Sequence, residues 1–492
     1  MFDLNEFLKQ FLYDPKNPLL FNNGFFVFFF TIFLTAYYLL RNNFPARKYL
    51  FCFFSLYFFY KASGFFVVFV ILSAIVDYFL SNAIYHQTKK RNKKLLLMAS
   101  IVFNLGLLFY FKYTNFFIAT CNDLLKTHFN PLNILLPVGI SFYTFENLSY
   151  TIDVYRGHFV PVKKFTDYLL FLSFFPKLVM GRIVRASDFI PQINKPYQVS
   201  ENDFAKGFYL IVSGLFKKLI ISDFISQNFV DYIFDDPSRY TGLECLFAVY
   251  GYAVVIYCDF SGYSDVAIGI AKWLGFTIPV NFTSPYQSKN ITEFWRRWHI
   301  SLSSWLRDYL YIPLGGNRKG VVRTYINLML TMLLGGLWHG ASWNFIVWGG
   351  LHGAALAFHK VWKEKTEKLF NLNKNSRFIN ALSVLITFHF VCFCWIFFKS
   401  ADFSTAEDML HQITHDFDFS VWKDFFANYK SVLGLMLLAY LLHSIPDDLA
   451  DKITGRFKKI PLVYYLGIFF LFVLLYGFFK SSEPVMPIYL RF

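Results

Sequence analysis

The stretch Tyr325 to Phe358, YINLMLTMLLGGLWHGASWNFIVWGGLHGAALAF, decides the fold of this 492-residue chain. It runs for 34 residues without one Lys, Arg, Asp or Glu. One membrane helix needs ~20 residues and two with a turn need over ~40, so the length fits neither. We predict that the segment breaks inside the membrane, where Gly335, Gly336 and Gly340 stand beside His339. Non-helical backbone at that depth must be buried in protein or reached by water, so His339 should face a cavity.

The composition of the whole chain supports a membrane protein. Hydrophobic residues make up 56%, aromatic residues 22% and charged residues only 16%, against the ~25% charged residues of soluble domains. Sixty-six Phe and a mean hydropathy of +0.40 exclude a disordered chain and a coiled coil. The net charge of +15 is interpreted as an excess of Lys and Arg in cytoplasmic loops, so no nucleic-acid partner is expected.

Roughly eleven apolar runs are long enough to cross, or nearly cross, a bilayer. They lie near residues 25–40, 49–60, 65–81, 95–111, 166–181, 207–222, 244–271, 325–358, 380–398, 431–445 and 461–479. The predicted fold is therefore an all-α polytopic membrane protein with about eleven transmembrane helices. Basic clusters at 41–48 and 89–94 flank two of the runs and are placed in the cytoplasm. No repeat or low-complexity linker divides the chain, so a single domain over residues 1–492 is expected.

The cysteines and the N-terminus exclude other features. The six cysteines are scattered without C-x-x-C spacing, which indicates neither a disulfide framework nor a zinc site. Met1 to Pro18 mixes acids and bases and is not typical of a cleaved signal peptide, so the first spanning helix is expected to direct insertion. In the polar stretch 400–430, His411 and His415 could share a helix face and bind a metal with Asp416 or Asp418. Without a third clear ligand we favour a solvated loop, and no metal is expected.

A second informative stretch is Asn290 to Leu310, NITEFWRRWHISLSSWLRDYL. Its apolar residues recur at helical spacing. They are Ile291, Phe294, Trp295, Trp298, Leu302, Trp305, Leu306 and Tyr309. Asn290 is placed to cap the first turn, with Glu293 in the capping-box position, and Pro313 ends the helix. We predict one helix that lies in the membrane interface.

The opposite face of this helix carries Arg296, Arg297 and Arg307, with His299 at the edge of the apolar stripe. From Ser288 to Thr324 seven basic residues and two acids give a net charge of +5. This charge suits a cytosolic site for a phosphorylated donor. A plain membrane-surface helix explains it equally well.

Buried polar residues are the remaining candidates for function. An intramembrane histidine near neutral pKa suits a general base, so catalysis or transport is favoured for His339 over a packing role between helices. For His352 a structural role is favoured. Glu146, Asp259 and Asp265 could line a cavity or carry protons, or could satisfy helix termini. No GxSxG elbow, Walker loop or GxGxxG fingerprint occurs.

Five blocks together resemble the membrane-bound O-acyltransferase family, in particular its bacterial branch typified by the alginate O-acetylase. They are LPVGISFYTFENLSYTIDVYRG from Leu136, FFPKLVMGRIVR from Phe174, YCDFSGYSDVAIGIAKWLGF from Tyr257, NFTSPYQSKNITEFWRRWHISLSSWLRDYLYIPLGGN from Asn281 and GGLWHGASWNFIVWGGLHG from Gly335. The family core covers about residues 100–400. Arg182 departs from the family pattern, which has proline there, and puts the local backbone shape in doubt.

The resemblance implies a ring of helices, with re-entrant and interfacial helices, around a central catalytic cavity in a thin membrane centre. His339 matches the family's catalytic histidine and would deprotonate an acceptor hydroxyl or a carrier group for attack on a thioester. His299 matches the second characteristic polar position and would orient the donor carbonyl or support the oxyanion.

The donor implied by the resemblance is acetyl-CoA or another acyl thioester, used as a substrate and not as a bound cofactor. Arg296, Arg297 and Lys289 are our candidates for holding its phosphates. Further candidate substrate-binding residues are Trp338, Asn344 and Asp308.

The acceptor differs within the branch: alginate or another exopolysaccharide, peptidoglycan, or a teichoic acid that receives D-alanine from a carrier protein. Similarity to the alginate type favours acetyl transfer in a Gram-negative inner membrane, with a periplasmic acetyltransferase as partner. A transporter and a non-enzymatic scaffold for polysaccharide export remain alternatives. The transporter is disfavoured because no inverted repeat is found and the Trp/Arg helix is directed at the cytosolic face.

Overall fold

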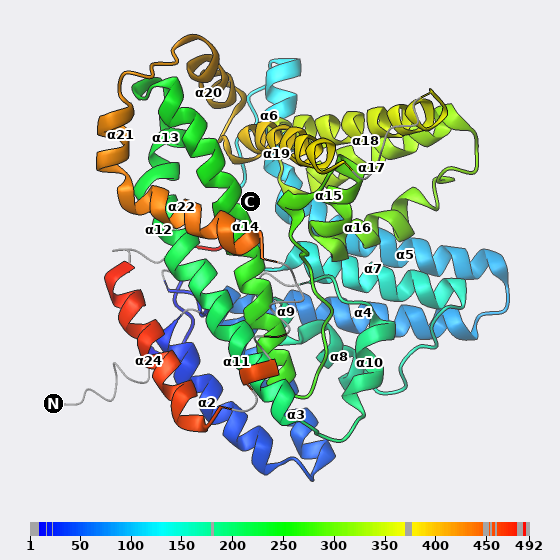
Figure 1. The fold of residues 1–492 in the computed structure, drawn as a ribbon. Coiled ribbons are helices and arrows are strands. Elements are labelled where there is room, and N and C mark those ends of the chain that lie inside the picture. Colours follow the sequence, from blue (N-terminus) through cyan, green and yellow to red (C-terminus); the bar gives the residue numbers. More distant parts are fainter. Residues whose placement is uncertain are drawn as a thin grey trace. The chain divides into compact units, whose positions relative to one another are not determined.

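The computed structural model describes residues 9–15, 17–21, 23–178, 182–369, 376–445, 452, 455–457, 460–479 and 486–488. Every regular element in this part of the chain is helical, as predicted (Figure 1). Contacts within the chain divide it into two compact units, residues 1–211 with 266–279 and residues 212–265 with 280–492. Each unit is described in turn.

The first unit is built from helices of very different length. They are α2 (Gly24–Leu39), α3 (Phe44–Ser63), α4 (Val67–His86), α5 (Lys90–Leu108), α6 (Thr114–Leu125), α7 (Ile140–Arg156), α8 (Phe165–Ser173), α9 (Phe175–Leu178) and α10 (Ala186–Ile193), together with most of α11 (Glu201–Leu215). Between the two basic clusters the chain forms α3 and α4, which are separated at Gly64, a residue with a φ of +63°.

Buried polar groups in the first unit are held by other side chains. Glu146 of α7 forms an ion pair with Lys177 at 2.8 Å and accepts the Val184 N–H at 3.0 Å. Asp77 of α4 accepts the Asn104 amide at 2.6 Å and the Ser100 hydroxyl. Because burying a lone charge is costly, these partners explain how the carboxylates are accommodated. Glu146 is thus paired inside the protein, and its predicted roles in a cavity, in proton transfer or at a helix terminus stay predictions.

The second unit contains the longest helices and several short π-helical turns. Its main elements are η3 (Phe216–Ser222), α12 (Asp223–Ile225), η4 (Ser226–Val230), α13 (Asp231–Asp235), most of α14 (Gly242–Trp273), η6 (Pro285–Gln287), α15 (Ile291–Arg297), α16 (Ile300–Leu306), η7 (Arg307–Tyr311), α17 (Val321–His339), α18 (Trp343–Leu369), α19 (Arg377–Lys399), α20 (Phe403–His415), α21 (Trp422–Asn428), α22 (Lys430–His443) and α24 (Leu462–Phe479).

Five helical stretches in the described part are long and apolar enough to cross a membrane. They are Phe44–His86, Lys90–Leu125, Gly242–Trp273, Val321–His339 and Arg377–Lys399. A sixth arises if α21 and α22, which meet at an angle of 82°, form one broken span. Two further apolar helices, Gly24–Leu39 and Val463–Phe479, are shorter. These helices indicate a multi-pass membrane protein, while the count of eleven and the ring stay predictions.

Two predicted segments need comment. The run 166–181 forms the short helices α8 and α9, and its last three residues, 179–181, lie outside the described residues. The prediction of a loop over 400–430 is wrong, because the stretch contains α20 and α21. The start of α20 is fixed by Asp402, which accepts the Thr405 N–H at 2.8 Å. His411 lies 3.2 Å from Asp416 on the exposed end of α20. No cluster of three metal-ligating side chains is found among the residues described.

Candidate active site

The hairpin of α17 and α18 places His339. The apolar segment breaks after His339, and the two helices lie side by side (Figure 1). That this break lies inside the membrane stays a prediction. A Cβ on Gly336 would lie 2.2 Å from the Phe345 carbonyl oxygen, and one on Gly349 would lie 2.4 Å from that of Met332. The helices therefore pack backbone against backbone, and their glycines make this possible. His339 is fixed at the C-terminal end of α17, where it is buried.

The helix that carries His299 is broken, contrary to the single helix predicted over Ile291 to Tyr309. α15 ends at Arg297 and α16 begins at Ile300, and His299 between them has a φ of +43°. The break is stabilised from outside the helix by Asn281. Its backbone oxygen accepts the Ile300 N–H at 3.0 Å. Its side-chain oxygen accepts the N–H of Ser301 at 3.1 Å and the hydroxyl of Ser301 at 3.0 Å.

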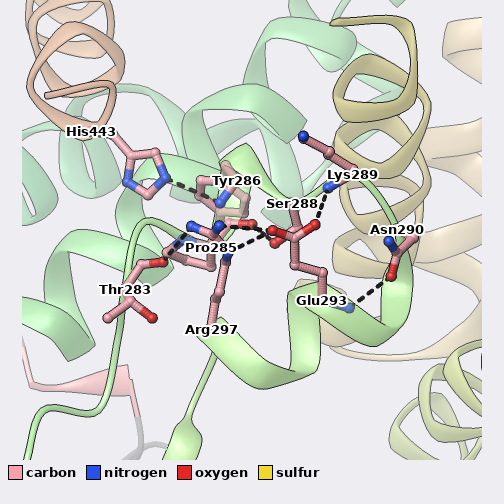
Figure 2. Close-up of polar contacts among 9 residues, drawn as sticks. All are labelled: Thr283, Pro285, Tyr286, Ser288, Lys289, Asn290, Glu293, Arg297 and His443. Atoms are coloured by element: carbon pink, nitrogen blue, oxygen red, sulfur yellow. Dashed lines mark hydrogen bonds and ion pairs between the residues drawn. The ribbon is translucent and has the colours of Figure 1, made fainter. Parts of the chain in front are cut away.

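The start of this region follows the sequence prediction closely. The Asn290 side chain accepts the Glu293 N–H at 2.9 Å, which confirms the N-cap (Figure 2). The Glu293 carboxylate reaches back and accepts the N–H of Lys289, also at 2.9 Å, one residue before the position usual in a capping box. The cap therefore fixes where α15 begins.

The apolar stripe survives the break. All eight of its members, from Ile291 to Tyr309, are buried. They pack against other elements of the second unit, including Trp348 of α18 and Trp395 of α19. The apolar stripe therefore faces protein. The predicted burial of these residues is confirmed, whereas the prediction that they lie on one continuous helix is wrong.

His339 and His299 come together although 40 positions separate them in the sequence. Their ring centroids are 6.4 Å apart, and the side chains are 3% and 0% exposed. His299 Nδ1 lies 3.5 Å from the Ser301 hydroxyl oxygen. Two imidazoles at this separation are close enough to act on adjacent atoms of one substrate group.

Aromatic rings enclose the paired histidines. Trp348 and Phe398 lie 5.0 and 5.3 Å from the His339 ring, and Phe260 lies 4.7 Å from the His299 ring. Such walls exclude water and strengthen the electrostatic interactions of a reacting group. The sequence reasoning missed these three residues, together with Asn281. The only signal for them is that three of the four lie in the blocks quoted above.

The candidate donor-binding residues have different surroundings. Arg296 and Lys289 are exposed. Arg297 is half-buried and its guanidinium lies 2.7 Å from the Glu293 carboxylate (Figure 2). It also donates to the Thr283 carbonyl at 3.3 Å. Arg297 therefore has protein partners already, whereas the other two side chains are presented to the outside.

Of the three further candidate substrate-binding residues, one lies beside the paired histidines and the other two have other protein partners. Trp338 lies at the site, with its ring 5.1 Å from that of His339 and 6.1 Å from that of His299. Asn344 is buried and donates its amide to the Ser400 carbonyl at 3.0 Å, which joins the start of α18 to the end of α19. Asp308 forms an ion pair with Arg307 at 2.6 Å, and this hydrogen bond raises the pKa of Arg307.

Other polar candidates have structural surroundings. His352 accepts the Trp295 indole N–H at 3.3 Å and packs against Trp348, and the structural role favoured for it stays a prediction. Asp259 pairs with Lys218, and Asp265 with Lys217. These lysines of η3, of which Lys218 is buried and Lys217 half-buried, were not predicted. A signal for them was available, because two adjacent Lys stand inside an apolar run.

Comparison with known proteins gives a consistent result. Residues 160–401 match the membrane-bound O-acyltransferase family. The chain is 38% identical to the peptidoglycan O-acetyltransferase of Helicobacter pylori over 362 residues, which cover 68% of this chain and 67% of that protein. It is 42% identical to the probable alginate O-acetylase of Pseudomonas aeruginosa over 354 residues, or 70% and 65% of the two chains.

A more distant relative belongs to the alternative class. The teichoic acid D-alanyltransferase of Bacillus subtilis is 30% identical over 289 residues, which cover 56% of this chain and 72% of that protein. The matches to the first two relatives span about two thirds of their length. All three similarities are to proteins named as acyl- or aminoacyl-transferring enzymes.

Proposed function

The chain belongs to the membrane-bound O-acyltransferase family, and from this premise we propose that it moves an acetyl group from a cytosolic thioester across the membrane. The acetyl group is destined for the hydroxyls of a cell-surface polysaccharide, either an alginate-like exopolysaccharide or peptidoglycan. The proposed location is the bacterial inner membrane, with a ring of helices around the catalytic centre. A periplasmic acetyltransferase is the proposed partner for delivery to the sugar.

The pairing of His339 with His299 is the observation that carries this proposal. In the proposed step His339 takes the proton of an acceptor hydroxyl, and the oxygen attacks the carbonyl carbon of the thioester. A new carbon–oxygen bond forms, the carbon–sulfur bond breaks, and the proton passes to the departing sulfur. His299, 6.4 Å away between ring centroids, donates to the carbonyl oxygen as negative charge develops there.

The position of His339 suits the proton transfer. It is the last residue of α17, and a helix C-terminus carries partial negative charge. That charge favours a side chain which becomes positive while it holds the acceptor's proton. The aromatic walls keep water from competing with the acceptor for the thioester.

The donor is proposed to approach from the side that carries the exposed basic residues. Arg296 and Lys289 are available for the phosphates of a coenzyme A ester, because both side chains are exposed. Arg297 is a weaker candidate because it is paired with Glu293. A carrier-protein donor would use the same charges through its own acidic surface.

The experiment that tests the function compares cells lacking this gene after complementation. Wild type, His339→Ala and His352→Gln are produced at matched membrane abundance, and base-labile acetate is measured in separated polysaccharide fractions. We expect wild type and His352→Gln to restore acetate and His339→Ala to lower the rate by ~10²–10⁴-fold, the usual contribution of a general base. His352→Gln is a matched control, since it is equally buried in the same hairpin and glutamine also accepts from Trp295.

Each other outcome identifies a different function. Restoration of acetate by His339→Ala would show that the histidine is structural and would favour the scaffold. If the cells that lack the gene lose D-alanine esters from their polysaccharides and keep their acetate, the teichoic-acid type is favoured, which the Bacillus subtilis relative represents. If acetate accumulates in one fraction only, that fraction contains the acceptor.

A further inference from the structure

A large apolar cavity lies in the second unit, and neither His339 nor His299 lines it. Its volume is about 1,020 Å³, at the upper end of the ~300–1,000 Å³ usual for small-molecule sites. Residues of α14, η6, α19, α21 and α22 form its walls. Leu385, Phe426 and Leu437 of this wall are 53%, 45% and 62% exposed, so the cavity opens at the surface of the protein.

The helices beside the opening are candidate membrane spans. α19 is long and apolar enough to span, and α21 with α22 passes the same criteria as a broken span. As spans, these helices would place the opening in hydrocarbon and not in water. An empty apolar groove would forfeit dispersion contacts along its whole lining, so a hydrocarbon chain from the bilayer is the natural occupant.

One residue of the lining, His443, has a buried ring nitrogen that the described residues leave without a hydrogen-bond partner. This residue ends α22, is 8% exposed and lines the cavity. Its Nε2 accepts the backbone N–H of Tyr286 at 3.1 Å (Figure 2), so in the neutral ring Nδ1 carries the hydrogen. Nδ1 is buried and has no hydrogen-bond partner among the described residues. A buried donor without an acceptor is costly, and a ligand oxygen would remove the cost.

The histidine and two tyrosines elsewhere in the wall are already paired. His389 donates from Nδ1 to the Leu385 carbonyl at 2.8 Å and accepts the Tyr250 hydroxyl at 3.0 Å. The Tyr440 hydroxyl donates to the Tyr250 carbonyl at 2.9 Å. The cavity therefore matches a long apolar molecule with one hydrogen-bond acceptor near one end.

Lining residues at the end of α22 and at the start of α19 indicate which molecule that is. His443 stands at the end of its helix, where a membrane helix reaches the interfacial region. Asn380, which also lines the cavity, lies in the first turn of α19, one helical turn from the exposed Arg377. A glycerophospholipid has its ester carbonyls at the interface and its phosphate just beyond, in reach of such a cation.

We propose that this cavity binds a glycerophospholipid of the surrounding bilayer, with an acyl chain between α19 and α22 and an ester carbonyl accepting from His443 Nδ1. The site is separate from the catalytic one, so it stands or falls independently of the proposed acetyl transfer.

Gly434 offers a direct test. It lines the cavity on α22, and a Cβ built on it meets nothing within 4 Å, so Gly434→Leu fills the groove without disturbing the protein. Gly467→Leu on α24 is the matched control, since its Cβ also meets nothing within 4 Å and it does not line the cavity. Both changes favour the helix, because leucine has the better helix propensity.

The full-length protein is reconstituted with phosphatidylglycerol that carries a photoactivatable group in one acyl chain, and crosslinked peptides are identified by mass spectrometry. We expect crosslinks in α19 and α22 that fall about tenfold in Gly434→Leu and are unchanged in Gly467→Leu. Equal crosslinking of the two variants would overturn the proposal. So would a competition experiment in which an unlabelled isoprenoid phosphate lowers the crosslinking more than unlabelled phosphatidylglycerol does.

A second measurement tests the hydrogen bond. The ether analogue of the same phospholipid has no ester carbonyl, and it should compete about two- to tenfold less well against the labelled lipid, the worth of one neutral hydrogen bond. His443→Leu should abolish this preference. If ester and ether lipids compete equally with the wild-type protein, the proposed contact with His443 is wrong.

Discussion

Replacement of Asn281 by alanine tests whether the break at His299 is held from outside the helix. The Asn281 amide oxygen accepts both the N–H and the hydroxyl of Ser301, and all of these atoms belong to buried residues. Asn281→Ala removes this acceptor but leaves the backbone bond to Ile300. The left-handed backbone of His299, with a φ of +43°, would then be held without the hydrogen bonds from Ser301 to the Asn281 side chain.

The expected magnitude follows from the orphaned group. A buried N–H that loses its partner costs ~1–3 kcal/mol. The Ser301 hydroxyl can rotate toward another acceptor, so only the N–H is counted. A left-handed conformation at a non-glycine residue costs ~1–2 kcal/mol, which is enough to shift His299 to another conformation once the support is lost. Because ~1.4 kcal/mol corresponds to tenfold, acetyl transfer should fall about five- to hundredfold.

The assay measures acetyl transferred per mole of folded protein, in reconstituted membranes at saturating donor, together with the unfolding temperature. Ser301→Ala is the control, because it removes the hydroxyl and keeps the backbone N–H bonded to Asn281. It should lose much less activity than Asn281→Ala. If Asn281→Ala lowers only the amount of folded protein and not the turnover of what remains, Asn281 is not a positioning residue and the reasoning fails.

Two further predictions concern stability. Gly336→Ala should destabilise the α17–α18 hairpin by ~1–3 kcal/mol, because the added Cβ would lie 2.2 Å from the Phe345 carbonyl oxygen. Thermal unfolding in detergent measures this loss. Gly350→Ala is the control and should change little, because its added Cβ would lie 3.6 Å from its nearest neighbour. Asp402→Ala should weaken α20 by ~1 kcal/mol, which proteolysis or hydrogen exchange of that helix would detect, whereas Asp402→Asn should not. Hydrogen bonds from Thr405 hold the pKa of Asp402 below its ordinary value, so the wild-type cap should be present above that value and be lost as the pH falls through the folded-state pKa. Unchanged exchange of α20 in acid would contradict this.

The break after His339 could be predicted because its cause is local. An uncharged run of 34 residues is too long for one helix and too short for two within the membrane, and glycines cluster where it breaks. The buried stripe from Ile291 to Tyr309 was predictable for a similar reason, since the helical spacing of its apolar residues indicates it. The N-cap at Asn290 likewise depends on residues three positions apart.

The break at His299 could not be predicted because its cause is distant in sequence. Nothing in WRRWHISLS contains glycine or proline, and helical spacing continues through it. The turn depends on Asn281, which lies 18 residues earlier and contacts Ile300 and Ser301 only in the folded chain. The same limit applies to Phe398, which reaches His339 from α19.

The two histidines stand at helix breaks for a physical reason. Inside a continuous helix a side chain is directed along the helix surface and the backbone polar groups are all used. At an end, a side chain can point beyond the helix axis, and carbonyls or N–H groups become available near it. His339 gains the C-terminal end of α17 beside it, and His299 gains a backbone direction that no helical residue has. Two breaks from different elements can therefore bring two imidazoles to one enclosed point. The first break is set by glycine and length, and the second by a single asparagine, so substitutions at Asn281 should affect chemistry more than insertion.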